Sequence, residues 1–258
     1  MSSAIRPARP RRSLTVPLGI TAAIALTVWA FLATHLFDRF SLAQSGTIFR
    51  ELLQPNWDFL PRTVGPMLET IQIAVISSAI GCAIALPVSF LASRVTTPSR
   101  IVFWVDRNVL NLIRALPDLL YAMIFVAAVS IGPLAGILAL TFFSIGVVAK
   151  LLSETVDGID QGPIEAARAS GATGTQVTRT AVLPQVLPHF VAYSLYVFEL
   201  NVRASTVIGI VGGGGIGNVL NTQMKFFDWE NVAVVILELF ILVILIEQVS
   251  ISLRRRLV

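Results

Sequence analysis

Polar side chains, two of them charged, lie within one strongly apolar run in the last third of the chain. The segment PHFVAYSLYVFELNVRASTVIG carries Glu199, Asn201, Arg203 and Ser205. Because an arginine that faces lipid costs roughly 2.5–3.5 kcal/mol on insertion scales, such residues usually face protein or water. Glu199 and Arg203 are four residues apart, so a helix places them on one face. Either the pair only permits insertion, or its face lines an aqueous passage in which the forked guanidinium of Arg203 attracts an oxyanion.

Three acidic residues form a second candidate group. Glu154, Asp157 and Asp160 are spaced three apart, and clustered carboxylates at a membrane face can hold a metal ion for an enzyme acting on phosphorylated lipids. A solvated helix end explains the same spacing, and we favour that interpretation. The single cysteine, Cys82, lies in an apolar run, and the two histidines are far apart, so we expect no metal site.

A run of glycines follows the apolar segment that contains Arg203. It comprises Gly212, Gly213, Gly214, Gly215 and Gly217. The G-x-G-x-x-G spacing occurs in dinucleotide-binding folds, but only within a βαβ unit. Here a polar turn and another apolar run follow. We therefore expect close backbone approach at an outer gate, or a re-entrant segment covered by protein or water.

The segment GPIEAARASGATGTQVTRTAVLPQVLP, residues 162–188, is the least apolar long stretch of the second half. Pro163 suits the first position of a helix, the alanines favour helix, and Gly171 supplies a C-terminal stop. About two turns of helix are not stable alone in water, so this helix must dock on something. Its small side chains, with Glu165 and Arg168 at its two ends, suit insertion into a socket on a partner.

The composition places these residues in an integral membrane protein. Of 258 residues 55% are hydrophobic and 13% charged, with a mean hydropathy of +0.79, whereas soluble domains carry about 25% charged residues. Apolar runs of membrane-crossing length predict six helical spans. They lie at about residues 14–37, 66–92, 116–131, 134–152, 186–208 and 232–249.

An amphipathic segment comes directly before the third predicted span. Residues 100–116 are amphipathic, which predicts a helix lying at the membrane surface. Pro117 and Asp118 follow. Asp118 either lies at an inner gate or caps a helix kinked at Pro117.

Basic residues predict the orientation. With both termini in the cytoplasm, fourteen of the nineteen lysines and arginines fall on the inner side and five on the outer side. The membrane topology therefore explains the basic residues, and the positive net charge gives no reason to expect a nucleic-acid partner. We expect a basic tail, first helix and outer loop over residues 1–63, a core over 64–252 and a basic tail over 253–258.

Several motifs resemble one family. Glu165-Ala166-Ala167, then Gly171 after three residues, then Leu183-Pro184, resembles the cytoplasmic loop signature of ABC importer permeases, although Ala181 stands where that family usually has Ile. Residues 114–118, 183–188 and 198–217 are similar to the phosphonate-type permeases. The resemblance covers about residues 64–250 and is strongest over 163–217.

The resemblance implies an all-α, type I permease bundle of six transmembrane helices in a bacterial inner membrane. Its implied cargo is a phosphonate, phosphate or related oxyanion. A short coupling helix would contact a cytoplasmic ATPase through Glu165, Ala166, Ala167, Arg168 and Gly171. Implied partners are an ATPase dimer that binds ATP and Mg, an external solute-binding protein and a second permease, expected to be an identical copy.

Two alternatives come from other classes. One is the membrane-embedded enzyme considered above, and the other is an ion channel, which would work without the coupling helix. No G-x-x-x-x-G-K motif occurs, so we expect no ATP hydrolysis by this chain.

Overall fold

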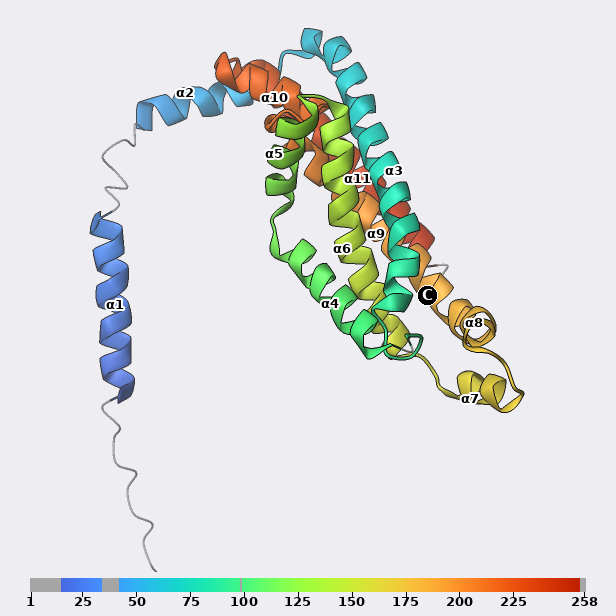
Figure 1. Cartoon of the computed structure of the whole chain (residues 1–258). Coiled ribbons are helices and arrows are strands. Elements are labelled where there is room, and N and C mark those ends of the chain that lie inside the picture. Colours follow the sequence, from blue (N-terminus) through green and yellow to red (C-terminus); the bar gives the residue numbers. More distant parts are fainter. Residues whose placement is uncertain (1–14, 34–41, 98, 256–258) are drawn as a thin grey trace, which may run out of the picture. The chain divides into compact units, whose positions relative to one another are not determined.

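The computed structural model describes residues 15–33, 42–97 and 99–255, and the regular structure within these ranges is helical (Figure 1). The α-helices are α1 (Thr15–Ala33), α2 (Leu42–Leu52), α3 (Leu60–Leu91), α4 (Arg100–Ala115), α5 (Asp118–Val129), α6 (Pro133–Asp157), α7 (Gly162–Ala169), α8 (Gly174–Val177), α9 (Leu183–Ile210), α10 (Ile216–Lys225) and α11 (Trp229–Arg254). The chain divides into two units, Met1–Phe49 and Arg50–Val258.

The first unit contains the apolar helix α1. Its described side chains, from Pro17 onward, are exposed, as expected for a helix surrounded by lipid. Both ends of the predicted first span, and the basic tail over residues 1–13, lie outside the described residues.

The second unit contains the predicted membrane-crossing helices that follow the first. Four described helices are long and apolar enough to cross a bilayer, over Trp57–Leu91, Pro133–Asp157, Gly174–Ile210 and Trp229–Arg254. A fifth candidate is the pair α4 and α5, which is bent by 88° at the Leu116-Pro117 break. The bend follows from Pro117, because the residue before a proline is driven out of helical geometry. The count of six spans stays a prediction.

The centre of this bundle is the contact between α3, α6 and α9. Gly81 of α3 lies so close to Ser144 of α6 that a Cβ atom there would overlap the serine side chain. Asn201 of α9 is fully buried, and its amide nitrogen donates to Ser78 and Ser144, at 2.8 Å each, and to Ser77 at 3.3 Å. Small residues and hydrogen bonds of this kind hold helices together where lipid removes the hydrophobic driving force.

The glycine run connects α9 to α10 by close backbone contacts. Gly212, Gly214 and Gly215 have positive φ angles of 101°, 83° and 70°, which favour glycine. The Gly132 amide donates to the Gly212 carbonyl at 2.8 Å, and the Ile216 amide donates to the Thr70 hydroxyl at 2.8 Å. The predicted close approach of backbones is therefore confirmed, and the role as an outer gate stays a prediction.

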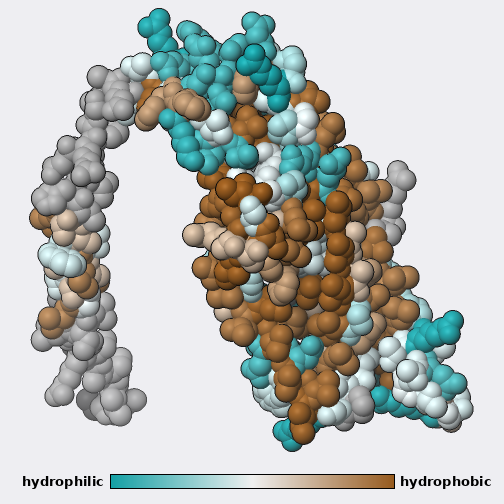
Figure 2. All heavy atoms as spheres, turned by 45° about the horizontal axis from the view of Figure 1, so that its top comes forward, coloured by the Kyte–Doolittle hydropathy of each residue, from teal (hydrophilic) through white to brown (hydrophobic). Residues whose placement is uncertain are grey.

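Apolar side chains dominate the surface of the bundle. Figure 2 shows them gathered along its length between more polar ends. Many large apolar side chains are outward-facing, among them Ile101, Leu112, Phe240, Leu245 and Val249. Such a continuous apolar surface is typical of a protein embedded in lipid.

Replacing Gly217 by Ala is expected to destabilise the bundle. The added methyl group would overlap the Thr206 carbonyl oxygen of α9, and overpacking of this kind costs about 1–3 kcal/mol. Thermal unfolding of the detergent-purified protein measures the effect. Gly65→Ala is the matched control, because nothing lies within 4 Å of the position that its added methyl group would take; equal unfolding temperatures for both variants would contradict the packing account.

Candidate functional site

Helix α7 is the short coupling helix predicted over about residues 163–171. It runs from Gly162 to Ala169, with Pro163 in its first turn, and Gly171 follows with a positive φ of 81°. The Ala172 amide donates to the Ala167 carbonyl at 3.1 Å, which closes the helix end. The predicted helix and its glycine stop are confirmed.

One side chain anchors α7 to the rest of the chain. Ile164 is fully buried in a cluster with Leu152 and Val156 of α6 and Val182 and Val186 near the start of α9. Glu165, Ala166 and Arg168 are exposed, whereas Ala167 is half-buried and packs against the same cluster. The helix is therefore fixed by its apolar side, with Glu165, Ala166 and Arg168 on its exposed side. Figure 1 shows α7 protruding at one end of the bundle. Their role in ATPase contact stays a prediction.

Glu199 is the centre of a cluster of three charges. The buried carboxylate accepts from Arg203 through Oε1, one helical turn away, and from Arg254 of α11 through Oε2 at 2.9 Å. The predicted pair of Glu199 and Arg203 is present, and Arg254 joins it. One carboxylate facing two guanidinium groups leaves a net positive charge, which is favourable for an anion nearby.

A cavity of about 640 Å³ lies against this cluster, between α4, α6, α9 and α11. Two arginines contribute to its wall, Arg114 from α4 and Arg254 from α11. Tyr193 and Tyr196 of α9 also line it, and Tyr193 shares a 2.9 Å hydrogen bond with Thr155 of α6. The remaining wall is largely apolar. We call this space the arginine cavity; it combines positive charge, hydroxyl groups and room for a small oxyanion.

The other polar residues predicted for a passage lie elsewhere. Asn201 and Ser205 are buried, and Asn201 points toward α3 and α6. Asp118 begins α5 at the 88° bend, and its carboxylate accepts from the Leu119 amide at 2.9 Å. These positions suit structural roles, and nothing in their contacts joins them to the arginine cavity; their part in translocation stays a prediction.

The three acidic residues considered for a metal site have separate partners. Asp157 accepts from Ser93 at 2.7 Å and from the Arg94 amide at 2.8 Å. Glu154 pairs with Lys150 at 3.0 Å, and Asp160 accepts from the Gly162 amide at 3.0 Å. Their carboxylates thus stabilise the ends of α3, α6 and α7.

Sequence reasoning did not assign Arg254, Arg114, Tyr193 or Tyr196 to a site. Arg254 was expected in a C-terminal tail from residue 253, whereas α11 continues through it to reach Glu199. The contact joins residues 55 positions apart, so no local spacing indicates it.

The class of protein is a membrane transport subunit. Its features are long apolar helices, a protruding anchored helix and a cationic cavity between the helices. Comparison with known proteins agrees. The family model described as "Binding-protein-dependent transport system inner membrane component" matches residues 85–257. The chain belongs to this family.

Individual relatives and one solved structure are similar to most of this chain. The phosphite transport system permease protein PtxC of Stutzerimonas stutzeri is 40% identical over 223 residues, covering 86% of this chain and 80% of that protein. The phosphate-import permease protein PhnE of Mycolicibacterium smegmatis is 37% identical over 236 residues, covering 91% of this chain and 42% of that longer protein. An inward-facing structure of the MetNI methionine ABC transporter gives a TM-score of 0.70 at 26% identity, covering 79% of this chain and 99% of that chain.

These findings support a type I ABC importer permease, as the sequence motifs implied, and give no support to the membrane-enzyme alternative. The chain is thus a transport subunit.

Replacing Glu199 by Ala is expected to destabilise the protein by about 1.5–3 kcal/mol, because the charge-assisted hydrogen bonds from Arg203 and Arg254 are lost. Both arginines are partly exposed, which keeps the loss below that of breaking a fully buried ion pair. Thermal unfolding in detergent measures the loss, and Glu230→Ala at the exposed start of α11 is the matched control. Adding Arg254→Ala to Glu199→Ala should restore part of the stability. A Glu199→Ala variant as stable as the control would show that the cluster contributes nothing.

Proposed function

We propose that this chain is the permease through which an ATP-driven importer moves phosphate, phosphite or a phosphonate across a bacterial inner membrane. The observation that carries the choice of cargo is the arginine cavity beside the Glu199 cluster. Guanidinium groups bind the oxygens of phosphate-like anions through paired hydrogen bonds. The names of the relatives, which include phosphite and phosphate permeases, support the same class.

The proposed energy source is a separate ATPase dimer that binds ATP and Mg and contacts α7. A protruding helix anchored by Ile164 suits this role, because a push on α7 reaches α6 and α9 through the same apolar cluster. Closure of the ATPases would rock the bundle between inward-open and outward-open states, a rigid-body change about an interface. Both termini and α7 would then lie on the cytoplasmic side.

The proposed assembly contains two permease chains, expected to be identical, and an external binding protein that delivers the solute. The glycine run between α9 and α10 lies at the end of the bundle opposite α7 (Figure 1), where such a protein would dock. Its close backbone contacts suit an outer gate, because small shifts of tightly packed backbones open or close a path.

Reversing the charge of Glu165 tests the contact with the ATPase. Glu165→Arg is expected to abolish co-purification of the ATPase without preventing membrane insertion, since Glu165 is exposed and anchors nothing. Glu230→Arg makes the same charge change at the exposed start of α11 and should leave co-purification intact. Retention of the ATPase by Glu165→Arg would rule out α7 as the docking helix.

Neutralising single arginines tests the oxyanion path. Arg114→Gln is expected to lower phosphate or phosphite uptake about tenfold, because Arg114 lines the arginine cavity and a hydrogen bond to a charged group contributes about 1.5–3 kcal/mol. Arg203→Gln should also impair uptake, because it removes one positive charge from the adjoining Glu199 cluster. Uptake into proteoliposomes containing the full complex measures the effect, with ATPase co-purification as the check on assembly. Arg62→Gln at the start of α3 is the control. Unchanged uptake kinetics in both variants would show that these two arginines do not take part in moving the anion.

A further inference from the structure

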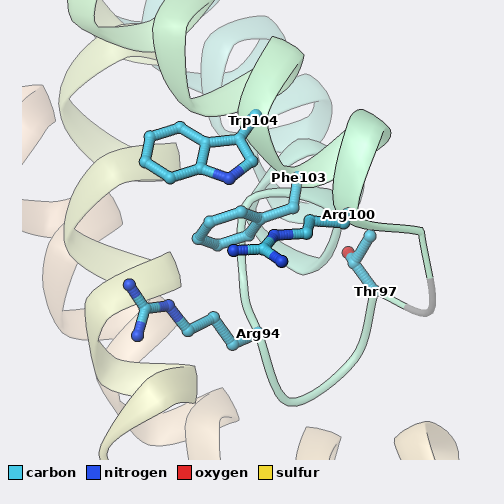
Figure 3. Close-up of a pocket in the computed structure, with 5 residues that line it drawn as sticks. All are labelled: Arg94, Thr97, Arg100, Phe103 and Trp104. Atoms are coloured by element: carbon cyan, nitrogen blue, oxygen red, sulfur yellow. The ribbon is translucent and has the colours of Figure 1, made fainter.

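A second basic cavity, of about 380 Å³, lies where α3 ends and α4 begins. Its walls are Arg94 and Thr97 from the connecting segment and Arg100, Phe103 and Trp104 from α4. Figure 3 shows the two arginine side chains extending into the space beside Phe103, with Trp104 on the adjoining turn. The arginine cavity described above has a different lining, so this is a separate site.

Neither arginine of this cavity has a carboxylate partner in the described part of the chain. The nearby acid, Asp157, is occupied by Ser93, by the Arg94 backbone amide and by Arg107 at 3.7 Å. The Arg94 guanidinium lies over the Phe103 ring, with its central carbon 5.5 Å from the ring centroid. That contact orients the group while leaving its N–H donors available.

The surroundings of the cavity are those of a membrane surface. Trp104 is 52% exposed, and tryptophan is enriched where hydrocarbon meets head groups. On the same outward face of α4, Ile101 is 76% and Val105 58% exposed. An apolar outward face on an otherwise amphipathic helix indicates acyl chains as its neighbours.

We propose that this cavity binds the phosphate of an anionic phospholipid, with the acyl chains lying along the exposed apolar face of α4. Arg94 and Arg100 supply the donors for the phosphate, and Trp104 packs at the level of the head group. A free inorganic phosphate has the same charged group but gains nothing from Ile101, Trp104 and Val105. The apolar face therefore favours the lipid over the free anion.

The site lies next to the helix proposed to couple to the ATPase. The segment that carries Arg94 also borders a cavity of about 280 Å³ shared with Arg168 of α7. Val95, the next residue, packs on the cluster that holds Ile164. A lipid held by Arg94 thus steadies the surface on which α7 rests.

The test uses the full chain in nanodiscs of phosphatidylcholine, with or without phosphatidylglycerol. Native mass spectrometry counts retained phosphatidylglycerol, and thermal unfolding measures the stabilisation it gives. Arg94→Gln/Arg100→Gln should weaken the apparent affinity about fivefold per arginine, from about 1 kcal/mol for each basic residue near an anionic surface. Unfolding in phosphatidylcholine alone should fall only by the small amount that the lost Arg94–Phe103 contact accounts for. The additional stabilisation given by phosphatidylglycerol is what the variant should lose.

Two matched variants and one added anion make the result decisive. Arg62→Gln/Lys225→Gln removes two cations from other parts of the bundle and should keep wild-type lipid retention. If this control lost as much phosphatidylglycerol as Arg94→Gln/Arg100→Gln, diffuse charge attraction would explain the binding and the proposed site would be wrong. Single Arg100→Gln provides the measurement if the double variant does not fold, and unchanged retention in it would also overturn the site. Inorganic phosphate added to the phosphatidylcholine discs should give no stabilisation; stabilisation dependent on Arg94 and Arg100 would assign the cavity to the free anion instead.

Discussion

Helices buried in lipid must satisfy their polar groups within the protein, and α9 is the element on which this constraint acts most strongly. One of its faces carries Asn201, whose amide nitrogen is bonded to serines of α3 and α6. Another face carries Glu199, whose two oxygens pair with Arg203 and Arg254. An unpaired polar group in hydrocarbon costs several kcal/mol, so neither face tolerates independent motion of α9. The bundle is therefore expected to move as a body.

The same helix continues at one end into the segment that supports α7. A π-helical turn, Thr178–Val182, joins α8 to α9, and its last residue packs on Ile164. A π turn inserts an extra residue into the helical repeat and is common at functional positions. In the proposed mechanism a displacement of α7 passes through Ile164 to α9 without any polar contact having to break. At its other end α9 leads into the glycine run. The proposed ATPase contact at α7 and the proposed outer gate at the glycines are therefore connected by one continuous helix.

Local patterns in the sequence predicted the features that depend on residues close together in the chain. Pro163, the alanines and Gly171 indicated α7, and the four-residue spacing of Glu199 and Arg203 indicated their ion pair. Contacts between distant segments carried no such signal. Arg254 reaches Glu199 only because α11 packs on α9 with a particular rotation and depth, and the serines that bind Asn201 lie 57 to 124 residues away. Small polar residues are ordinary in membrane helices, so their sequence does not reveal which of them face one another.

The distribution of carboxylates decides which arginines remain available to ligands. Asp157 takes Arg107, and Glu199 is shared by Arg203 and Arg254, whereas Arg94, Arg100 and Arg114 have no carboxylate partner in the described ranges. These three arginines line two cavities of different character. Both proposed ligands present phosphate-like oxygens, so the guanidinium groups alone do not distinguish them. The distinction comes from the neighbours: an exposed apolar face of α4 at one cavity, and tyrosines between four helices at the other. Separate surroundings therefore allow a phosphate-bearing lipid and a small oxyanion to bind one protein without competing.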